Sequence, residues 1–391
     1  MAHALDTNRR ELQPAIQWLR KVPTWWVYPF VVHLLILTAA TRFPLLFHVK
    51  IFPESYPNIA SGWFQWDSLW FINIGRFGYT HVPGQRNVQA AVAFFPFVPL
   101  LVHYFEQWIV LIVTQIVLII SMLLIKYIGE RAGLSYVQAI QAAWLFALSP
   151  AAIFYSTIYA EPWTLFCTLA SVFFGIKRRW WLAAMLGAMT ASTQGTGVLI
   201  GLFPLIRCIN SVVKKYWRDF WGAIVWGLGC ALGLAAYMVY LAATRHDPLA
   251  FSHAQSISWH AHWTWPWTVF VNAYKQMGLI GNGILILICI IMEIVYVIGV
   301  ILVWNIRGVP ISKPEKLSHL LYVTSGLIIT LCFYPAGPPF QSGIRIASIY
   351  YPVYLGLANR LPNWLFGVVM ICFACTAFVG SSLFIHGNFY Q

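Results

Sequence analysis

The chain has 391 residues, of which 60% are hydrophobic and only 9% carry a charge. Soluble domains have about a quarter charged residues, so these charges are too few to cover a water-facing surface, whereas a bilayer requires no such cover. The formal net charge of +13 does not indicate a nucleic-acid partner, because no contiguous basic face lies on a soluble element. The composition therefore predicts an all-α polytopic membrane protein.

Apolar runs near the length needed to span a bilayer, roughly 17–25 residues, follow one another along the chain. They cover 25–47, 108–125, 137–157, 162–176, 220–243, 279–304, 318–334, 345–359 and 364–386. A further stretch, 180–212, is interrupted at 193–197 by glycines and small polar residues, which predicts two short spans meeting at a turn. We therefore expect about eleven transmembrane helices in a single domain covering 1–391.

Basic residues indicate the orientation of these helices, since cytoplasmic segments of membrane proteins are enriched in Lys and Arg. The strongest clusters are the run at 177–179 and a group formed by Arg207, Lys214, Lys215 and Arg218. Two short spans between the clusters place both of them in the cytoplasm, together with the N-terminal segment 1–24. The segments 48–107, 244–278 and 335–344 then lie on the extracytoplasmic side.

The first extracytoplasmic loop, 48–107, is long for a connection without its own structure. It contains stretches of helical period rich in Trp and Phe, which predict amphipathic helices in the membrane interface. The apolar run 93–105 contains Pro96 and Pro99, and we expect it to enter the membrane without crossing it.

Two acidic residues in these outer segments are candidate catalytic groups. Asp67 lies among aromatic residues, where partial dehydration makes a carboxylate a better base for a sugar hydroxyl. The alternative role for Asp67 is an ordinary helix cap. Glu161 lies at an outer turn near 158–162, where an acidic residue is also favoured by the helix dipole alone. Glu293 differs, because it falls inside an apolar run, where acidic residues are candidates for function or for buried polar contacts.

The outer loop around 255–267 places aromatic side chains beside hydrogen-bonding groups. Gln255, Trp259 and His262 lie in it, and such a combination suits either a sugar ring or the headgroup level of the bilayer. His260 and His262 without a neighbouring carboxylate make a poor metal site, so we expect no metal and no other cofactor.

Arg345 lies at the outer end of a predicted span, on the side where Arg is disfavoured. A lipid phosphate is a natural partner, since its oxygens accept paired bonds from a guanidinium. Snorkelling of the side chain to the interface is the alternative.

Five segments, taken in order, resemble the PIG-V family and its prokaryotic relatives. PIG-V is the second mannosyltransferase of GPI-anchor assembly. The residues that carry the resemblance are Trp66-Asp67-Ser68, Trp70, Gly78-Tyr79, Ala93-Phe94-Phe95-Pro96, Pro99-Leu100, Ser149-Pro150-Ala151, Phe154-Tyr155-Ser156, Tyr159, Glu161, Gln255, Trp259, Pro266, Ser342, Arg345 and Pro352. The resemblance extends over most of the chain from about residue 60 to 355.

This resemblance implies a GT-C glycosyltransferase fold with its site on the extracytoplasmic or lumenal face. It implies a polyprenyl-phosphate mannose donor, a glycolipid or glycan acceptor, and inversion at the sugar carbon. Asp67 would be the general base, Arg345 would neutralise the departing phosphate, and Glu161 would orient sugar or acceptor. The remaining residues that we expect in donor or substrate binding are Trp66, Trp70, Arg76, Tyr79, Gln194, Gln255, Trp259 and His262.

The sequence departs from the family pattern at 193–197, where Gln194 stands in place of an Arg. The resemblance does not specify which membrane holds the protein. It would be the plasma membrane in a prokaryote or the endoplasmic reticulum membrane in a eukaryote. Two other functions remain, a transporter or flippase for a lipid-linked saccharide and a noncatalytic subunit. A flippase should line a path across the bilayer with polar residues, whereas the candidate residues here cluster on one side.

Overall fold

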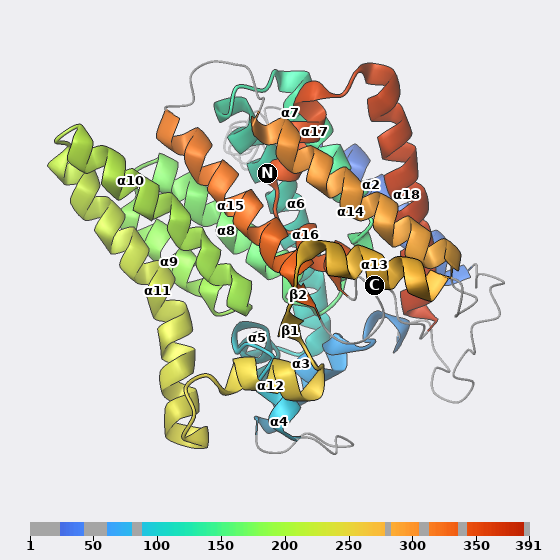
Figure 1. The fold of residues 1–391 in the computed structure, drawn as a ribbon, viewed down its shortest axis with the longest axis horizontal. Helices are drawn as coiled ribbons and strands as arrows, with labels where there is room; N and C mark the ends of the chain where they lie inside the picture. The colour runs from blue at the N-terminus through green and yellow to red at the C-terminus, as the bar shows by residue number, and fades with distance from the viewer. Residues whose placement is uncertain are drawn as a thin grey trace, which may run out of the picture.

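The computed structural model describes residues 24–42, 61–79, 88–277, 283–304, 313–334 and 342–386. These residues form an all-helical protein with one two-stranded sheet (Figure 1). The first half contains α2 (Val27–Arg42), the 3-10 helix η1 (Ser61–Trp63), α3 (Asp67–Phe77), α4 (Val88–Ala91), α5 (Phe97–Tyr104), α6 (Gln107–Arg131), α7 (Tyr136–Ala147), η2 (Ala152–Ser156), α8 (Glu161–Ile176) and α9 (Trp180–Ala191).

The second half continues with a further 3-10 segment, helices on both sides of the small sheet, and a C-terminal helix. Its elements are η3 (Gly195–Gly201), α10 (Leu202–Val213), α11 (Trp217–Arg245), α12 (Ala250–Ser258), β1 (His262–Trp263), α13 (Pro266–Met277), α14 (Gly283–Trp304), α15 (Lys313–Cys332), β2 (Phe333–Tyr334), α16 (Gly343–Ala347), α17 (Pro352–Arg360) and α18 (Asn363–Ile385).

The chain is an integral membrane protein, as its composition predicts. Among the described residues, five helical segments are long and apolar enough to cross a bilayer: Gln107–Arg131, Gly195–Val213, Trp217–Arg245, Ile286–Val303 and Asn363–Ile385. The shorter helices α2, α8 and α9 are also apolar. Large hydrophobic side chains on these helices are exposed, as expected of helix faces in contact with lipid.

Two runs expected as single spans are interrupted instead. The run 137–157 forms α7, which ends at Ala147, followed by a turn and η2. The run 345–359 is divided between α16 and α17. Pro150 follows the end of α7 and Pro352 begins α17, and proline lacks the N–H that would continue a helix across either point. Both breaks lie near residues of the candidate site, since Glu161 follows η2 and Arg345 lies in α16.

The expected break in 180–212 is present. Helix α9 ends at Ala191 and the chain resumes a helical path at Gly195, in the 3-10 segment η3. The helices η1, α3, α4 and α5 lie within 48–107, of which 48–60 and 80–87 are outside the described residues. Their position in the membrane interface stays a prediction. Within 93–105, α5 begins only after Pro96.

The two strands tie distant segments together. His262 pairs with Tyr334 and Trp263 with Phe333 in an antiparallel register, and the Thr264 N–H donates to the Cys332 carbonyl at 2.7 Å. These bonds join the loop after α12 to the end of α15. In Figure 1 the strands lie near the centre, close to α16, with α3, α5 and α12 gathered below them.

Candidate functional site

Three charged side chains from distant parts of the sequence meet in one cluster. An Arg345 Nη1 lies 2.5 Å from Asp67 Oδ2, and Arg345 Nε lies 2.9 Å from Glu161 Oε1. Asp67 is the first residue of α3, Glu161 the first residue of α8, and Arg345 lies in α16. The structure therefore brings the two predicted acids and the predicted cation into direct contact.

The cluster carries more negative than positive charge. Glu161 is buried at 3% exposure, and one guanidinium faces two carboxylates. Glu161 Oε2 has no hydrogen-bond partner among the described residues. The guanidinium carbon also lies 5.3 Å from the centre of the Tyr159 ring and 5.5 Å from that of Phe154, in cation–π range. A fixed cation and an unpaired carboxylate oxygen are thus present at one point.

Tyr159 positions the backbone of Asp67. Its hydroxyl accepts the Asp67 backbone N–H at 3.1 Å and donates to the Gln65 carbonyl at 3.4 Å. Burial, followed by the nearby Asp67 charge, raises the pKa of the Tyr159 phenol well above its ordinary value, so the hydroxyl stays neutral. Sequence reasoning gave Tyr159 no role, although its place two residues before Glu161 was a usable signal.

Left-handed backbone conformations occur beside two of the three charged residues. Trp66, directly before Asp67, has φ 54° and ψ −117°, and Ser342, at the start of α16, has φ 62° and ψ 5°. Such conformations cost a non-glycine residue about 1–3 kcal/mol and concentrate at functional sites. The backbone that presents Asp67 and Arg345 is therefore held in place by the surrounding fold.

Buried hydroxyl groups fix the position of α16. The Ser348 hydroxyl donates to the Arg345 carbonyl at 2.6 Å and accepts from the Tyr155 hydroxyl at 2.7 Å. The Tyr354 hydroxyl donates to the Ser348 carbonyl at 2.9 Å. Because these groups come from η2 and α17, the elements on both sides of Arg345 hold its backbone.

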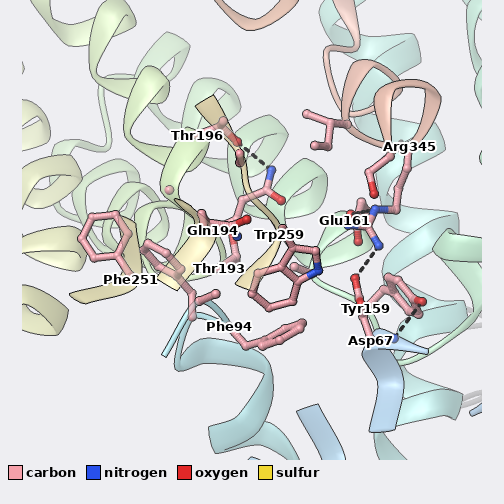
Figure 2. Close-up of a pocket in the computed structure, with 18 of the residues that line it drawn as sticks. Asp67, Phe94, Tyr159, Glu161, Thr193, Gln194, Thr196, Phe251, Trp259 and Arg345 are labelled. Carbon is pink, nitrogen blue, oxygen red and sulfur yellow. Dashed lines mark hydrogen bonds and ion pairs between the residues drawn. The ribbon is translucent and has the colours of Figure 1, made fainter. Parts of the chain in front are cut away.

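The charged cluster forms one side of a cavity of ≈ 1040 Å³. Figure 2 shows Asp67, Glu161 and Arg345 on the right, Phe251 on the left and Phe94 low in the centre. Polar and aromatic groups lie between Phe251 and the charged residues: Thr193, Gln194, Thr196 and Trp259 (Figure 2). The cavity is large enough for a drug-sized ligand, and it combines a charged end with an aromatic wall.

Rings along this wall pack against one another. Trp70 stacks on Phe94 with centroids 5.1 Å apart, and Trp259 meets Phe94 edge-on at 5.9 Å. Gln194 donates to the Thr196 hydroxyl at 2.9 Å. Flat rings beside amide and hydroxyl groups are suited to the apolar face and the hydroxyl edge of a sugar.

Most of the residues expected in the site line this cavity. They are Asp67, Glu161, Arg345, Trp66, Trp70, Gln194, Gln255 and Trp259. Thr193, Thr196, Phe94 and Phe251 also line it and were not among the expected site residues. The interruption at 193–197 was visible in the sequence, but which side chains it turns inward depends on packing.

Three expected binding residues do not line the cavity. Arg76 is exposed and donates to Gln107 Oε1 at 3.2 Å. Tyr79 is buried, and its hydroxyl donates to the Phe94 carbonyl at 2.7 Å, so it supports the wall from behind. His262 lies in β1, where its backbone pairs with Tyr334 and its side chain is exposed. Arg76 and His262 lie on faces of α3 and β1 that point away from the cavity, whereas Tyr79 follows Gly78, which ends α3 with φ 74°.

Two further candidates lie outside the cluster. Glu293 is fully buried in α14, does not line the cavity, and neither of its carboxylate oxygens has a hydrogen-bond partner among the described residues. Among all the residues that the structure describes, no group of three or more His, Cys, Asp or Glu side chains is placed to hold a metal ion.

A comparison with models of known protein families finds no match to this sequence, and a comparison with curated protein sequences finds no match either.

Proposed function

We propose that this chain is a membrane glycosyltransferase of the GT-C type, similar to the PIG-V family. It would transfer a mannosyl residue from polyprenyl-phosphate mannose to a hydroxyl of a glycolipid or glycan. The observation that carries the proposal is the contact of Asp67 and Glu161 with Arg345 at one end of a cavity with an aromatic wall.

The chemistry needs a base for the acceptor hydroxyl and a cation for the leaving phosphate. Asp67 would take the proton as the acceptor oxygen forms its bond to the sugar carbon. The bond from that carbon to the phosphate oxygen breaks on the opposite face, which inverts the carbon. The bonding electrons leave with the polyprenyl phosphate, whose added charge Arg345 would stabilise.

The pairing of Asp67 with Arg345 suggests the order of binding. In the ligand-free protein, Asp67 Oδ2 accepts a bond from Arg345 Nη1 at 2.5 Å, so this oxygen is occupied and not free to contact an acceptor hydroxyl. The donor phosphate is also an anion that an Arg side chain binds well. Donor binding would therefore displace Asp67 from Arg345 and release it to act on the acceptor.

The other cavity residues would hold the two sugars. Glu161 Oε2, which has no partner among the described residues, is available to accept a bond from a sugar hydroxyl. Trp259 and Trp70 offer ring faces, and Gln194 and Gln255 offer amides. The apolar residues Leu234 and Ile329 come from helices α11 and α15 and would meet the first units of the prenyl chain.

Transfer by the purified protein tests the proposal. Labelled mannose is supplied as polyprenyl-phosphate mannose with a lipid extract from the host as the acceptor source. We expect wild-type protein to transfer the label and Asp67→Asn to lose at least about 100-fold in rate, the usual contribution of a general base. Asp247→Asn is the matched control, because Asp247 lies in an outer loop with His253 as its partner.

Equal transfer by wild type and Asp67→Asn would remove Asp67 from the mechanism. Transfer from a different polyprenyl-phosphate sugar alone would keep the reaction class and change the donor. If the wild type moves a lipid-linked saccharide across a vesicle membrane without forming any new glycoside, the transporter hypothesis replaces this one.

A further inference from the structure

Exposed basic side chains gather at the end of the helices opposite the cavity. We define this basic end by the residues of two turns, α8–α9 and α10–α11: Lys177, Arg178, Arg179, Lys214, Lys215 and Arg218. Helix α8 has 16 residues between Glu161 in the cavity and this end, a rise of about 24 Å. That separation is close to the thickness of a bilayer core, so the basic end lies at the other membrane face.

A buried carboxylate fixes the two turns relative to each other. Asp219 accepts a bond from Arg207 at 2.9 Å and lies 3.0 Å from an Arg178 nitrogen. Two other acids are near, and each already has a cation: Glu315 lies 3.7 Å from Arg207, and Glu130 lies 2.8 Å from Lys126.

The other positive charges of the basic end have no such compensation. Within the described part of the chain, no ion pair joins a carboxylate to Lys177, Arg179, Lys214, Lys215 or Arg218. Lys177 lies over the rings of Tyr127 and Phe173 at 5.3 and 5.9 Å, so its charge is partly engaged. The other four charges are available to an anion from outside the protein.

The two turns share a backbone geometry that does not favour their residues. Each helix ends with a residue in the left-handed region, Arg178 at φ 56° and Lys215 at φ 58°. The Arg179 N–H bonds to the Phe174 carbonyl at 2.9 Å, and the Tyr216 N–H bonds to the Ser211 carbonyl at 2.8 Å, as in a Schellman motif. Glycine is the favoured residue at this position. A helix dipole favours basic residues near a C-terminus, but it gives no reason to prefer a strained cation to glycine.

Exposed aromatic side chains surround the basic residues. Trp181, Tyr216, Trp217 and Trp221 are all more than half exposed. Trp and Tyr are enriched at the level of lipid headgroups, where one side of the ring is apolar and the other is wet. Basic side chains at the level of the lipid headgroups can contact headgroup phosphates.

We propose that the basic end is a binding surface for anionic phospholipid headgroups of the leaflet opposite the cavity. Clusters of four to eight Lys and Arg beside membrane helices bind anionic lipids through their phosphates. In Figure 1 the α10–α11 turn, one of the two turns of the basic end, projects away from the rest of the molecule. The headgroups would hold the α9–α11 layer, whose η3 and α11 residues form one wall of the cavity.

One glycine substitution separates charge from fold. Lys215→Gly removes a cation at a left-handed position, so the turn itself is expected to be kept or stabilised. His246→Gly is the matched control, because His246 caps the other end of α11 with φ 56° and lies outside the basic end. We expect Lys215→Gly to weaken binding of phosphatidylglycerol roughly 5-fold, and His246→Gly to leave it unchanged.

A double substitution gives a larger effect. Lys214→Gln/Arg218→Gln should weaken binding roughly 30-fold, equivalent to about 2 kcal/mol. Arg42→Gln/Lys275→Gln removes the same two residue types from exposed positions elsewhere and should have no effect. Binding is measured as retention of labelled phosphatidylglycerol or phosphatidylcholine by immobilised full-length protein in detergent. The measurement is made at 50 mM and at 500 mM salt, where the screening lengths are roughly 14 Å and roughly 4 Å.

The expected result is a preference of the wild-type protein for phosphatidylglycerol that falls at high salt and in the two basic-end variants. Equal retention of the two lipids by wild type would overturn the proposal, as would equal losses in each variant and its control. Displacement of phosphatidylglycerol by polyprenyl phosphate but not by excess unlabelled phosphatidylglycerol would also overturn it, since the surface would then serve the lipid-linked substrate. The wild-type comparison remains decisive if a variant does not fold.

Discussion

Arg345 is the residue on which the charge balance of the cavity depends. It contacts Glu161 at 2.9 Å and Asp67 at 2.5 Å, and Glu161 is almost completely buried. Removing one partner of a buried ion pair is costly, because the remaining charge is left in a medium that solvates it poorly. The Arg345 side chain, which would bind the donor phosphate, thus also stabilises the ligand-free protein.

This dual role leads to a stability prediction. Arg345→Gln should reduce the free energy of unfolding by about 3 kcal/mol, measured by thermal and denaturant unfolding in detergent. Arg345→Gln/Glu161→Gln should regain part of the loss, because the buried carboxylate is then neutral. An unchanged unfolding midpoint in the single variant would contradict the assigned burial of the pair.

At the scale of elements, the cavity depends on a close approach of η3 to the end of α9. A Cβ added to Gly197 would collide with the carbonyl of Thr190, whereas one added to Gly201 would meet nothing nearer than Cys230 Cβ at 4.0 Å. The absence of a side chain at Gly197 therefore allows the turn at 193–197 to lie against α9 and to direct Gln194 and Thr196 into the cavity.

Alanine at these two glycines is a matched test of that packing. Gly197→Ala should lower the free energy of unfolding by about 1–3 kcal/mol, as overpacking of a tight contact does, and should reduce any activity of the cavity. Gly201→Ala should leave both nearly unchanged. Similar effects at the two positions, measured by unfolding in detergent, would show that the approach at Gly197 is not limiting.

At the scale of the whole molecule, α11 relates the cavity to the basic end. Its 29 residues extend about 43 Å, from the turn at Lys214 and Lys215 to His246 and Asp247. A helix of this length exceeds the hydrocarbon core of a bilayer, so its ends are expected at opposite membrane faces. The proposed orientation places the Lys214 end in the cytoplasm.

Thiol labelling in intact cells checks this orientation. A membrane-impermeant maleimide added outside should label Asp247→Cys and not Lys214→Cys, and permeabilisation should expose Lys214→Cys as well. Wild-type protein provides the blank for its native cysteines, of which Cys372 and Cys375 are exposed on α18. The reverse labelling pattern would place the cavity on the cytoplasmic side.

The sequence by itself determined the membrane class and the break between helices at 193–197. Hydrophobic runs long enough to span a bilayer must be helical, because the hydrocarbon core offers their backbone groups no other partners. Glycine and small polar residues predicted the end of α9 at 193–197, whereas the breaks beside Pro150 and Pro352, inside runs expected as single spans, emerged only in the structure. The candidate residues Asp67, Glu161 and Arg345 stood out because charges are rare in so apolar a chain.

Only the tertiary structure decided which of these residues meet. Asp67 and Arg345 are 278 positions apart, and no local pattern reports a contact at that separation. Arg76 and Tyr79 lie close to Asp67 in sequence, yet neither lines the cavity: Arg76 lies on another face of α3, and Tyr79, beyond the end of α3, donates to the Phe94 carbonyl. The positioning contacts of Tyr159 and Ser348 also arise from packing, because a buried hydroxyl takes whichever partner the neighbouring elements supply.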